Sequence, residues 1–192
     1  RQTPLQREIT GRWARDGAIQ WLRVDALVDP ARTYRLELTA PAAAPAPAMS
    51  VTTQNGKIVL DTGAARYVLG GANSPIAEVW LGEHRLATSA GARGLYVVDQ
   101  TGREASAVLD GNNSLVESRG PVAACVRCEG FYRAADGAPL ARYIVRVEAF
   151  AGLPQAKVTH TLVLSEDTQK VWFREIGWEF SVDAGAGVRA VF

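Results

Sequence analysis

Cysteine, histidine and long apolar runs are scarce in this sequence of 192 residues. The two cysteines neither require a disulfide framework nor exclude an oxidising compartment. No window is apolar for long enough to span a bilayer, so we expect no membrane-spanning segment and no membrane partner. Hydrophobic residues still make up 47% of the chain, which is enough for a sizeable core in one large domain or two small ones.

A dominant charge of one sign is also lacking. The chain has 21 basic and 20 acidic residues and a formal net charge of +1. This balance argues against a phosphate-binding surface, and the glycine-rich stretches have no phosphate-loop form, so we expect no nucleic-acid partner. Residue 1 is Arg, and no basic region with an apolar run follows it. We therefore expect either that a targeting segment was removed or that the chain is a piece of a longer protein.

Helical periodicity and internal repeats are absent, whereas strand-like runs are frequent. Turn signals recur about every 8–12 residues, which indicates an all-β sandwich or barrel. The clearest pair of runs covers residues 142–150 and 157–164, where apolar and polar residues alternate. Gly152 and Pro154 supply the turn between the two runs. This stretch predicts a hairpin of half-buried strands.

Two dipeptides predict further tight hairpins. Asp16-Gly17 lies between runs at residues 6–13 and 18–27, and Asn55-Gly56 lies between residues 51–53 and 57–61. Each dipeptide readily adopts the positive φ angles that such turns require. Both pairs are therefore expected to be antiparallel.

Other segments predict strands and the connections between them. A third early strand is expected at residues 34–39. Residues 40–48 are rich in proline, so no central strand is possible there, and we expect a long loop, with a domain linker as the alternative. Asp110-Gly111-Asn112-Asn113 predicts a turn between strands at 105–109 and 114–118. A last strand is expected at residues 171–180.

Several segments resemble one family of bacterial and fungal proteins, the exo-rhamnogalacturonan lyase-like family. WARDGAIQWLRVDALVDP (residues 13–30) and YRLEL (34–38) resemble its amino-terminal barrel, with Ala18 where serine is usual. KIVLDTGAARYVL (57–69) resembles the end of that barrel. The family's central β-sandwich is resembled by VESRGPVAACVRCEGFY, AGLP and VTHTL, at residues 116–132, 151–154 and 158–162.

The resemblance implies an all-β protein with a partial barrel-like portion at residues 1–69 and an incomplete β-sandwich at 70–192. Family lyases cut uronic-acid-containing polysaccharides by β-elimination and continue into a helical toroid, which is absent here. The chain is then expected to support or line a glycan cleft, to need no cofactor, to be inactive alone, and to be secreted or periplasmic. Its partners would be a polysaccharide or oligosaccharide and the missing helical domain. The alternative is a non-catalytic carbohydrate-binding or scaffold sandwich.

Arg142 and Arg146 are candidate carbohydrate-binding residues because they share one strand face. An arginine pair on a sheet binds a uronate carboxylate well through paired N–H donors. Either arginine is equally able to pair across strands with Glu148, Glu175 or Glu179.

His160 is the candidate base for β-elimination, which requires a nearby carboxylate neutraliser and access to the proton on the sugar ring. The alternative is a hydrogen-bonded core histidine, because its strand neighbours Val158 and Leu162 are apolar. We expect Arg142, Arg146 and His160 to mark the face that contacts sugar.

Trp172 and Trp178 are candidates for a sugar-stacking platform. Their even spacing places them on one face of an unbroken strand, unless Gly177 marks a bulge. Core packing is the alternative for both.

Two short motifs have plain structural explanations. Asp61-Thr62-Gly63 has the form of an aspartic-protease signature, which needs two carboxylates and therefore a homodimer; otherwise Asp61 ends a strand in an Asx turn. Cys125 and Cys128 are spaced for metal or redox chemistry, but no further paired zinc ligands exist. In a strand the two thiols point to opposite faces, so we expect no disulfide, with one thiol buried and one partly exposed.

Overall fold

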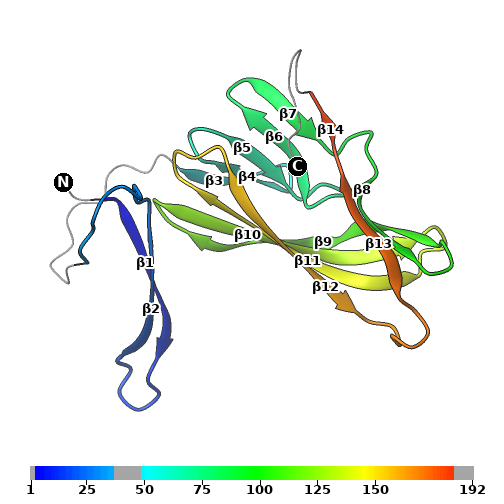
Figure 1. The fold of residues 1–192 in the computed structure, drawn as a ribbon, viewed down its shortest axis with the longest axis horizontal. Coiled ribbons are helices and arrows are strands. Elements are labelled where there is room, and N and C mark those ends of the chain that lie inside the picture. The colour runs from blue at the N-terminus through cyan, green and yellow to red at the C-terminus, as the bar shows by residue number, and fades with distance from the viewer. Residues whose placement is uncertain (1–2, 37–48, 184–192) are drawn as a thin grey trace.

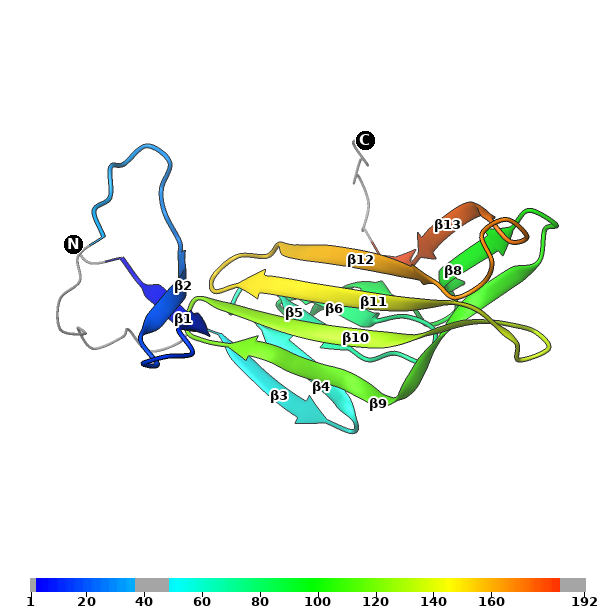
Figure 2. The ribbon, with the colours of Figure 1, turned by 90° about the horizontal axis from the view of Figure 1, so that it is seen from below.

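The computed structural model describes residues 3–36 and 49–183. These residues form 14 β-strands in three antiparallel sheets and contain no helix, so none of them crosses a bilayer as a helix (Figure 1). The predicted all-β sandwich is confirmed. Two six-stranded sheets pack face to face, and a separate two-stranded hairpin lies at one end (Figure 2).

The larger of these two sheets is the one with the longer strands. It is strongly curled and has the strand order β12-β11-β10-β9-β8-β13. Its hairpin of β11 and β12 confirms the alternating pattern, since Tyr143, Val145, Val147 and Ala149 are buried and their neighbours face outward. The strands are β8 (Gly94–Asp99), β9 (Glu104–Arg119), β10 (Ala123–Ala134), β11 (Pro139–Phe150), β12 (Ala156–Leu164) and β13 (Phe173–Glu179).

The second six-stranded sheet has the order β14-β7-β6-β5-β4-β3. Asn55 and Gly56 have φ angles of 50° and 74°, as the predicted tight turn between β3 and β4 requires. Because β5 pairs with β6, residues before and after the position 69–70 belong to the same sheet. The strands are β3 (Ser50–Gln54), β4 (Lys57–Asp61), β5 (Arg66–Leu69), β6 (Ile76–Leu81), β7 (His84–Thr88) and β14 (Ser181–Val182).

The core lies between these two sheets. Leu60 and Leu69 of the second sheet are fully buried against Val126, Tyr132 and Val145 of the larger one. Burial of this apolar surface is the main source of the sandwich's stability. Phe180 alone separates β13 from β14, so the chain passes directly from the edge of one sheet to the edge of the other.

The separate hairpin consists of β1 (Leu5–Arg12) and β2 (Ile19–Ala26) and confirms the predicted Asp16-Gly17 turn. Gly17 has a φ angle of 69°, and the amide of Trp13 donates to Ala18 O at 2.9 Å. The two strands pair only with each other among the described residues and project from the end of the sandwich (Figure 1).

Two expectations about strands need comment. The prediction of a turn at Asp110–Asn113 is wrong, because these positions belong to the continuous strand β9. Cys128 is opposite Ser114 and Gly130 is opposite Leu109, so the extra residues interrupt the register without reversing the chain. Residues 34–36 do not form the expected third strand; its remainder and the proline-rich loop lie outside the described residues.

Candidate functional site at the junction of hairpin and sandwich

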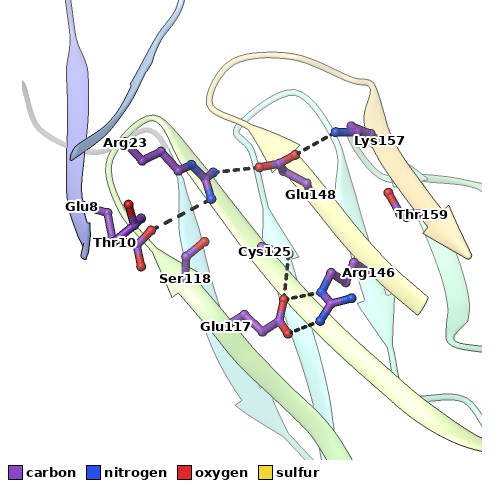
Figure 3. Close-up of a pocket in the computed structure, with 10 residues that line it drawn as sticks. All are labelled: Glu8, Thr10, Arg23, Glu117, Ser118, Cys125, Arg146, Glu148, Lys157 and Thr159. Carbon is purple, nitrogen blue, oxygen red and sulfur yellow. Dashed lines mark hydrogen bonds and ion pairs between the residues drawn. The ribbon is translucent and has the colours of Figure 1, made fainter. Parts of the chain in front are cut away.

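A pocket of about 380 Å³ lies where the hairpin meets the outer face of the larger sheet (Figure 3). This size is within the range of small-ligand clefts, and sites formed between two structural units are common. Almost all of the residues that line it have polar or charged side chains: Glu8, Thr10, Arg23, Glu117, Ser118, Cys125, Arg146, Glu148, Lys157 and Thr159.

The floor of the pocket is formed by residues that are paired across neighbouring strands. Cys125 is opposite Ser118 on one side and Glu148 on the other, and Glu148 is opposite Lys157. The four side chains therefore form one row across β9 to β12. Arg146 and Thr159 are partners in the adjacent row. The floor thus extends from the inner strands β9 to β11 to the edge strand β12.

A bulge in β9 adds an acidic group to this floor. Cys125 pairs with Ser118, but the next residue, Val126, pairs with Val116. Glu117 is the extra residue, and both Glu117 and Ser118 line the pocket. Bulges commonly redirect side chains in this way. Glu117 accepts two hydrogen bonds from Arg146, at 2.7 and 2.9 Å, and these bonds lower the pKa of the Glu117 carboxyl.

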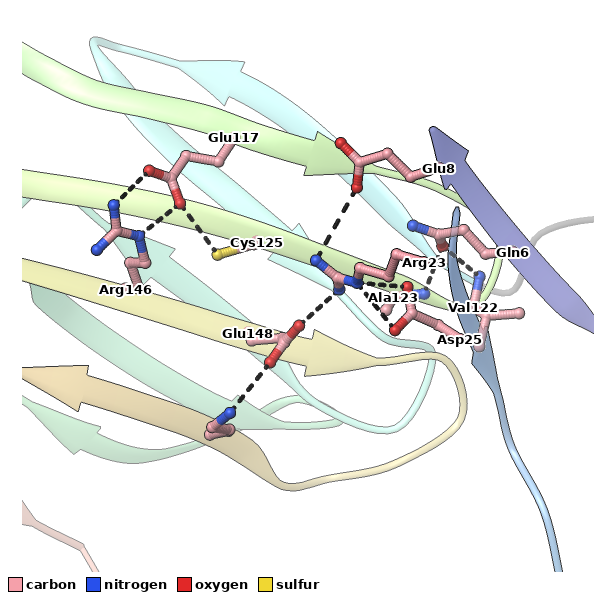
Figure 4. A network of polar contacts seen from close by, with 11 residues as sticks. Gln6, Glu8, Arg23, Asp25, Glu117, Val122, Ala123, Cys125, Arg146 and Glu148 are labelled. Carbon is pink, nitrogen blue, oxygen red and sulfur yellow. Dashed lines mark hydrogen bonds and ion pairs between the residues drawn. The ribbon is translucent and has the colours of Figure 1, made fainter. Parts of the chain in front are cut away.

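Gln6 fastens the hairpin to the sandwich (Figure 4). It is the one buried residue among the described residues 3–36, with 8% of its surface exposed. Its Oε1 accepts hydrogen bonds from the backbone N–H groups of Val122 (3.3 Å) and Ala123 (2.9 Å). A Cβ atom at Gly120 would overlap this oxygen. Glycine at position 120 is therefore what admits the Gln6 side chain.

Arg23 makes a second connection between the hairpin and the sheet. Its guanidinium donates to Glu148 Oε1 at 2.8 Å and to Asp25 at 3.1 Å, and Glu8 lies 3.9 Å away. The hydrogen bond to Asp25, together with the neighbouring carboxylates, raises the pKa of Arg23. Glu148 also faces Lys157 at 3.8 Å, so the contacts run continuously from β2 to β12 (Figures 3 and 4).

Cys125 lies in the pocket floor, with its thiol 3.7 Å from Glu117. Burial, assisted by the charges of Glu117 and Glu148, raises the pKa of this thiol to about 11. A protonated thiol is a poor nucleophile and metal ligand at neutral pH. Cys128 is also buried, and neither cysteine forms a disulfide. The expectation of one partly exposed thiol is wrong, because Cys125 is buried as well, with Glu117 in contact with its thiol.

The two candidate arginines lie on the same outer face but have different surroundings. Arg146 lines the pocket, whereas Arg142 lies beyond it and donates to Glu129 at 2.9 Å. The carboxylate partners are thus Glu117 and Glu129, on the neighbouring strands β9 and β10, and not the three glutamates that the sequence indicated.

His160 lies on the opposite face of the sheet. It is the register partner of the buried Val145, so the expectation that it shares a face with Arg142 and Arg146 is wrong. Its Nε2 is 2.8 Å from the hydroxyl of Tyr132, and burial lowers its pKa. Among the described residues no carboxylate contacts His160.

The two candidate tryptophans are placed differently from each other. Trp172 precedes β13 and is 57% exposed. Trp178 packs against the core, stacks on Phe180 and donates from its indole N–H to Ser74 at 2.9 Å. Pairing of β13 with β8 is irregular between Phe173 and Glu175, not at Gly177.

Gly177 has a different role: a Cβ there would overlap the ring of Tyr96. Its missing side chain leaves room for that ring on the neighbouring strand β8.

Asp61 ends β4 in the turn expected from the sequence, since its Oδ1 accepts the N–H of Gly63 at 2.8 Å. The hydroxyl of Thr62 is buried and donates at 2.8 Å to the carbonyl of Leu153 in the β11–β12 turn. The motif therefore joins the two sheets. In the part of the chain that the structure describes, no three His, Cys, Asp or Glu residues are grouped as metal ligands.

Most of the pocket residues were not candidates from the sequence. Glu117 and Ser118 reach it through a bulge, and Glu8, Thr10 and Arg23 reach it through the docking of a distant hairpin. The one local signal is the β11–β12 hairpin, where Glu148 and Lys157 face each other across the turn.

The fold and the pocket together describe an all-β sandwich domain with a polar site on its outer face. The sequence model of one protein family, described as the PcRGLX-like protein central beta sandwich domain, matches residues 49–188. The chain therefore belongs to this rhamnogalacturonan lyase-like family, and the resemblance of its sandwich segments is confirmed. A comparison with curated proteins finds no match. The match begins at residue 49, so it does not include the hairpin.

Proposed function

We propose that this chain is the β-domain region of a polysaccharide lyase-like protein that acts on uronic-acid-containing glycans. In this proposal the sandwich supports or lines the substrate cleft, and the protein is secreted or periplasmic. Family membership carries the proposal. The polar pocket that presents Arg146 beside the hairpin supports a role in glycan contact.

The elimination chemistry is proposed to depend on parts of the protein outside this chain, such as the helical toroid of the family. Within the described residues, the candidate base His160 already bonds to Tyr132 and has a lowered pKa. It lies on the core side of its sheet, away from Arg146. A base for β-elimination requires both access to the sugar proton and a carboxylate neutraliser.

The test combines gene sequence and assay. If the gene continues beyond Phe192 into a helical segment, the whole protein should raise ultraviolet absorbance from acidic polysaccharides, because β-elimination creates an unsaturated uronide. The present chain alone should bind such glycans without the absorbance change. A whole protein that neither binds nor cleaves acidic glycans would refute the proposal.

The second candidate is a non-catalytic carbohydrate-binding or scaffold module. The same pocket favours this second candidate. Its charged side chains already bond to one another, as expected of a preformed binding site. Glycan binding without elimination by the whole protein would establish it.

The aspartic-protease alternative predicts that Asp61→Asn abolishes peptide hydrolysis. We expect no hydrolysis in either form, because Asp61 Oδ1 accepts a turn amide.

A further inference from the structure

We propose that the junction pocket is a subsite for one acidic sugar residue, with the sugar carboxylate held between Arg146 and Lys157. This inference rests on the proposed function and assigns a ligand class to one place in the fold. Of the two candidate arginines, only Arg146 lies in the pocket, and Lys157 enters it from the edge strand β12.

Both cations have donors available for a ligand. Arg146 uses Nε and Nη2 to bind Glu117, which leaves Nη1 without a partner among the described residues. Lys157 has one charged neighbour there, Glu148 at 3.8 Å, and its side chain is 69% exposed. A lysine ammonium has three donors. A carboxylate therefore finds a fixed donor on one side and an adjustable one on the other.

The remaining donors suit a ligand rich in hydroxyl groups. Thr10 of the hairpin and Thr159 of β12 line the pocket, and in the described part of the chain neither hydroxyl has a hydrogen bond. Ser118 Oγ is buried without a hydrogen-bond partner among the described residues. A buried hydroxyl without a partner is costly, and rotation of the Ser118 side chain toward the pocket would let it bond to a ligand hydroxyl.

The charge of the lining limits the ligand further. Three acidic and three basic residues line the pocket: Glu8, Glu117 and Glu148, and Arg23, Arg146 and Lys157. A phosphate group carries close to two negative charges at neutral pH and would need a clear excess of positive charge. A singly charged carboxylate needs less compensation, so a uronate fits the lining better than a sugar phosphate.

The hairpin is part of this site because it supplies Thr10, Glu8 and Arg23. Its position depends on the seating of Gln6 against Gly120. Releasing the hairpin should therefore lower the affinity of the pocket for its ligand, even though the part of the pocket formed by the sheet stays intact.

The experiment measures binding of a galacturonate trisaccharide to the whole chain by titration calorimetry, with a neutral galactose trisaccharide as the comparison ligand. Lys157→Gln should weaken acidic-sugar binding about two- to fivefold, the range expected for a charge pair with a largely exposed lysine. Arg142→Gln is the matched control, because Arg142 lies on the same face outside the pocket. This control should bind like the wild type.

Each other outcome overturns the subsite. Equal affinity for the acidic and neutral trisaccharides would refute carboxylate recognition. Acidic-sugar binding that Lys157→Gln leaves unchanged would move the glycan site elsewhere and leave the proposed function standing. Absence of binding to either sugar would refute the subsite, and elimination by the whole protein would then decide the proposed function separately.

Discussion

The sandwich and the β1–β2 hairpin place apolar side chains in opposite ways. In the sandwich, the inward faces of two sheets form one apolar core, and nearly all the charged residues of the described strands lie outside it. In the hairpin, the face toward the sandwich carries Gln6 and Arg23, whereas Ile9, Leu22 and Val24 face away from it. These three residues are 38–42% exposed.

This difference indicates that the two regions depend on different interactions. An isolated two-stranded hairpin is marginally stable in water. The hairpin must therefore be positioned by its polar contacts with the sandwich, while the sandwich is stabilised by its own core. The following predictions test this comparison, beginning with the largest effect.

Leu69→Ala should lower the free energy of unfolding by about 2–5 kcal/mol, because it opens a cavity at a fully buried position. Chemical denaturation monitored by tryptophan fluorescence measures the change. A loss below about 0.5 kcal/mol would show that the two sheets are not tightly packed against each other.

Tyr132→Phe should cost about 1–3 kcal/mol, because it removes a hydrogen bond and leaves the half-buried His160 Nε2 without its partner. Denaturation of this variant and of His160→Gln, together with the double variant, measures their coupling. Additive losses would contradict a direct bond between the two side chains.

The sandwich should lose stability as the pH falls below about 6.5, because partial burial lowers the pKa of His160 in the folded state. The unfolded chain then binds the proton more readily than the folded one, so full stability is present above that pH. Comparing unfolding free energies of wild type and His160→Gln between about pH 6.5 and 5 isolates this contribution. The exposed Thr161→Gln is the control, and a slope unchanged in His160→Gln would refute the assignment.

Gly120→Ala should displace the Gln6 side chain while leaving global unfolding almost unchanged. Hydrogen exchange at the amides of Val122 and Ala123 should accelerate, since both donate to Gln6 Oε1. Gln6→Ala added to Gly120→Ala should have little further effect, because the same bonds are already lost. A large drop in global stability would show that the hairpin is integral to the core.

Ile9→Ala should change the unfolding free energy by less than about 0.5 kcal/mol, as expected for a largely exposed position. The contrast with Leu69→Ala, measured by the same denaturation, is the sharpest form of the comparison. A loss of 2 kcal/mol or more would mean that the outer face of the hairpin is covered in solution.

Local patterns predicted the elements of this fold well. A few neighbouring residues were enough to predict three elements correctly. These are the alternating strand β11 and the turns at Asp16-Gly17 and Asn55-Gly56. The turn predicted at Asp110–Asn113 does not form, because turn chemistry is local, whereas β10 pairs with β9 on both sides of these residues.

The composition of the pocket could not be predicted from short stretches of sequence, because it depends on how distant strands pair. Register between β11 and β12 is set by the turn conformation, and a change of one residue moves His160 from one face to the other. The redirection of Glu117 requires knowing the pairing of β9 with β10. The seating of Gln6 beside Gly120 joins positions that are distant in the chain.

The direct passage from β13 to β14 has a consequence for the order of folding. β13 pairs with β8 and β14 pairs with β7, and both partners come much earlier in the chain. Contacts between distant residues form slowly because a long loop must close first. During synthesis, the outer edges of β7 and β8 must wait for residues 173–182 before either sheet is complete. Until then these two edges are open to pairing with another chain.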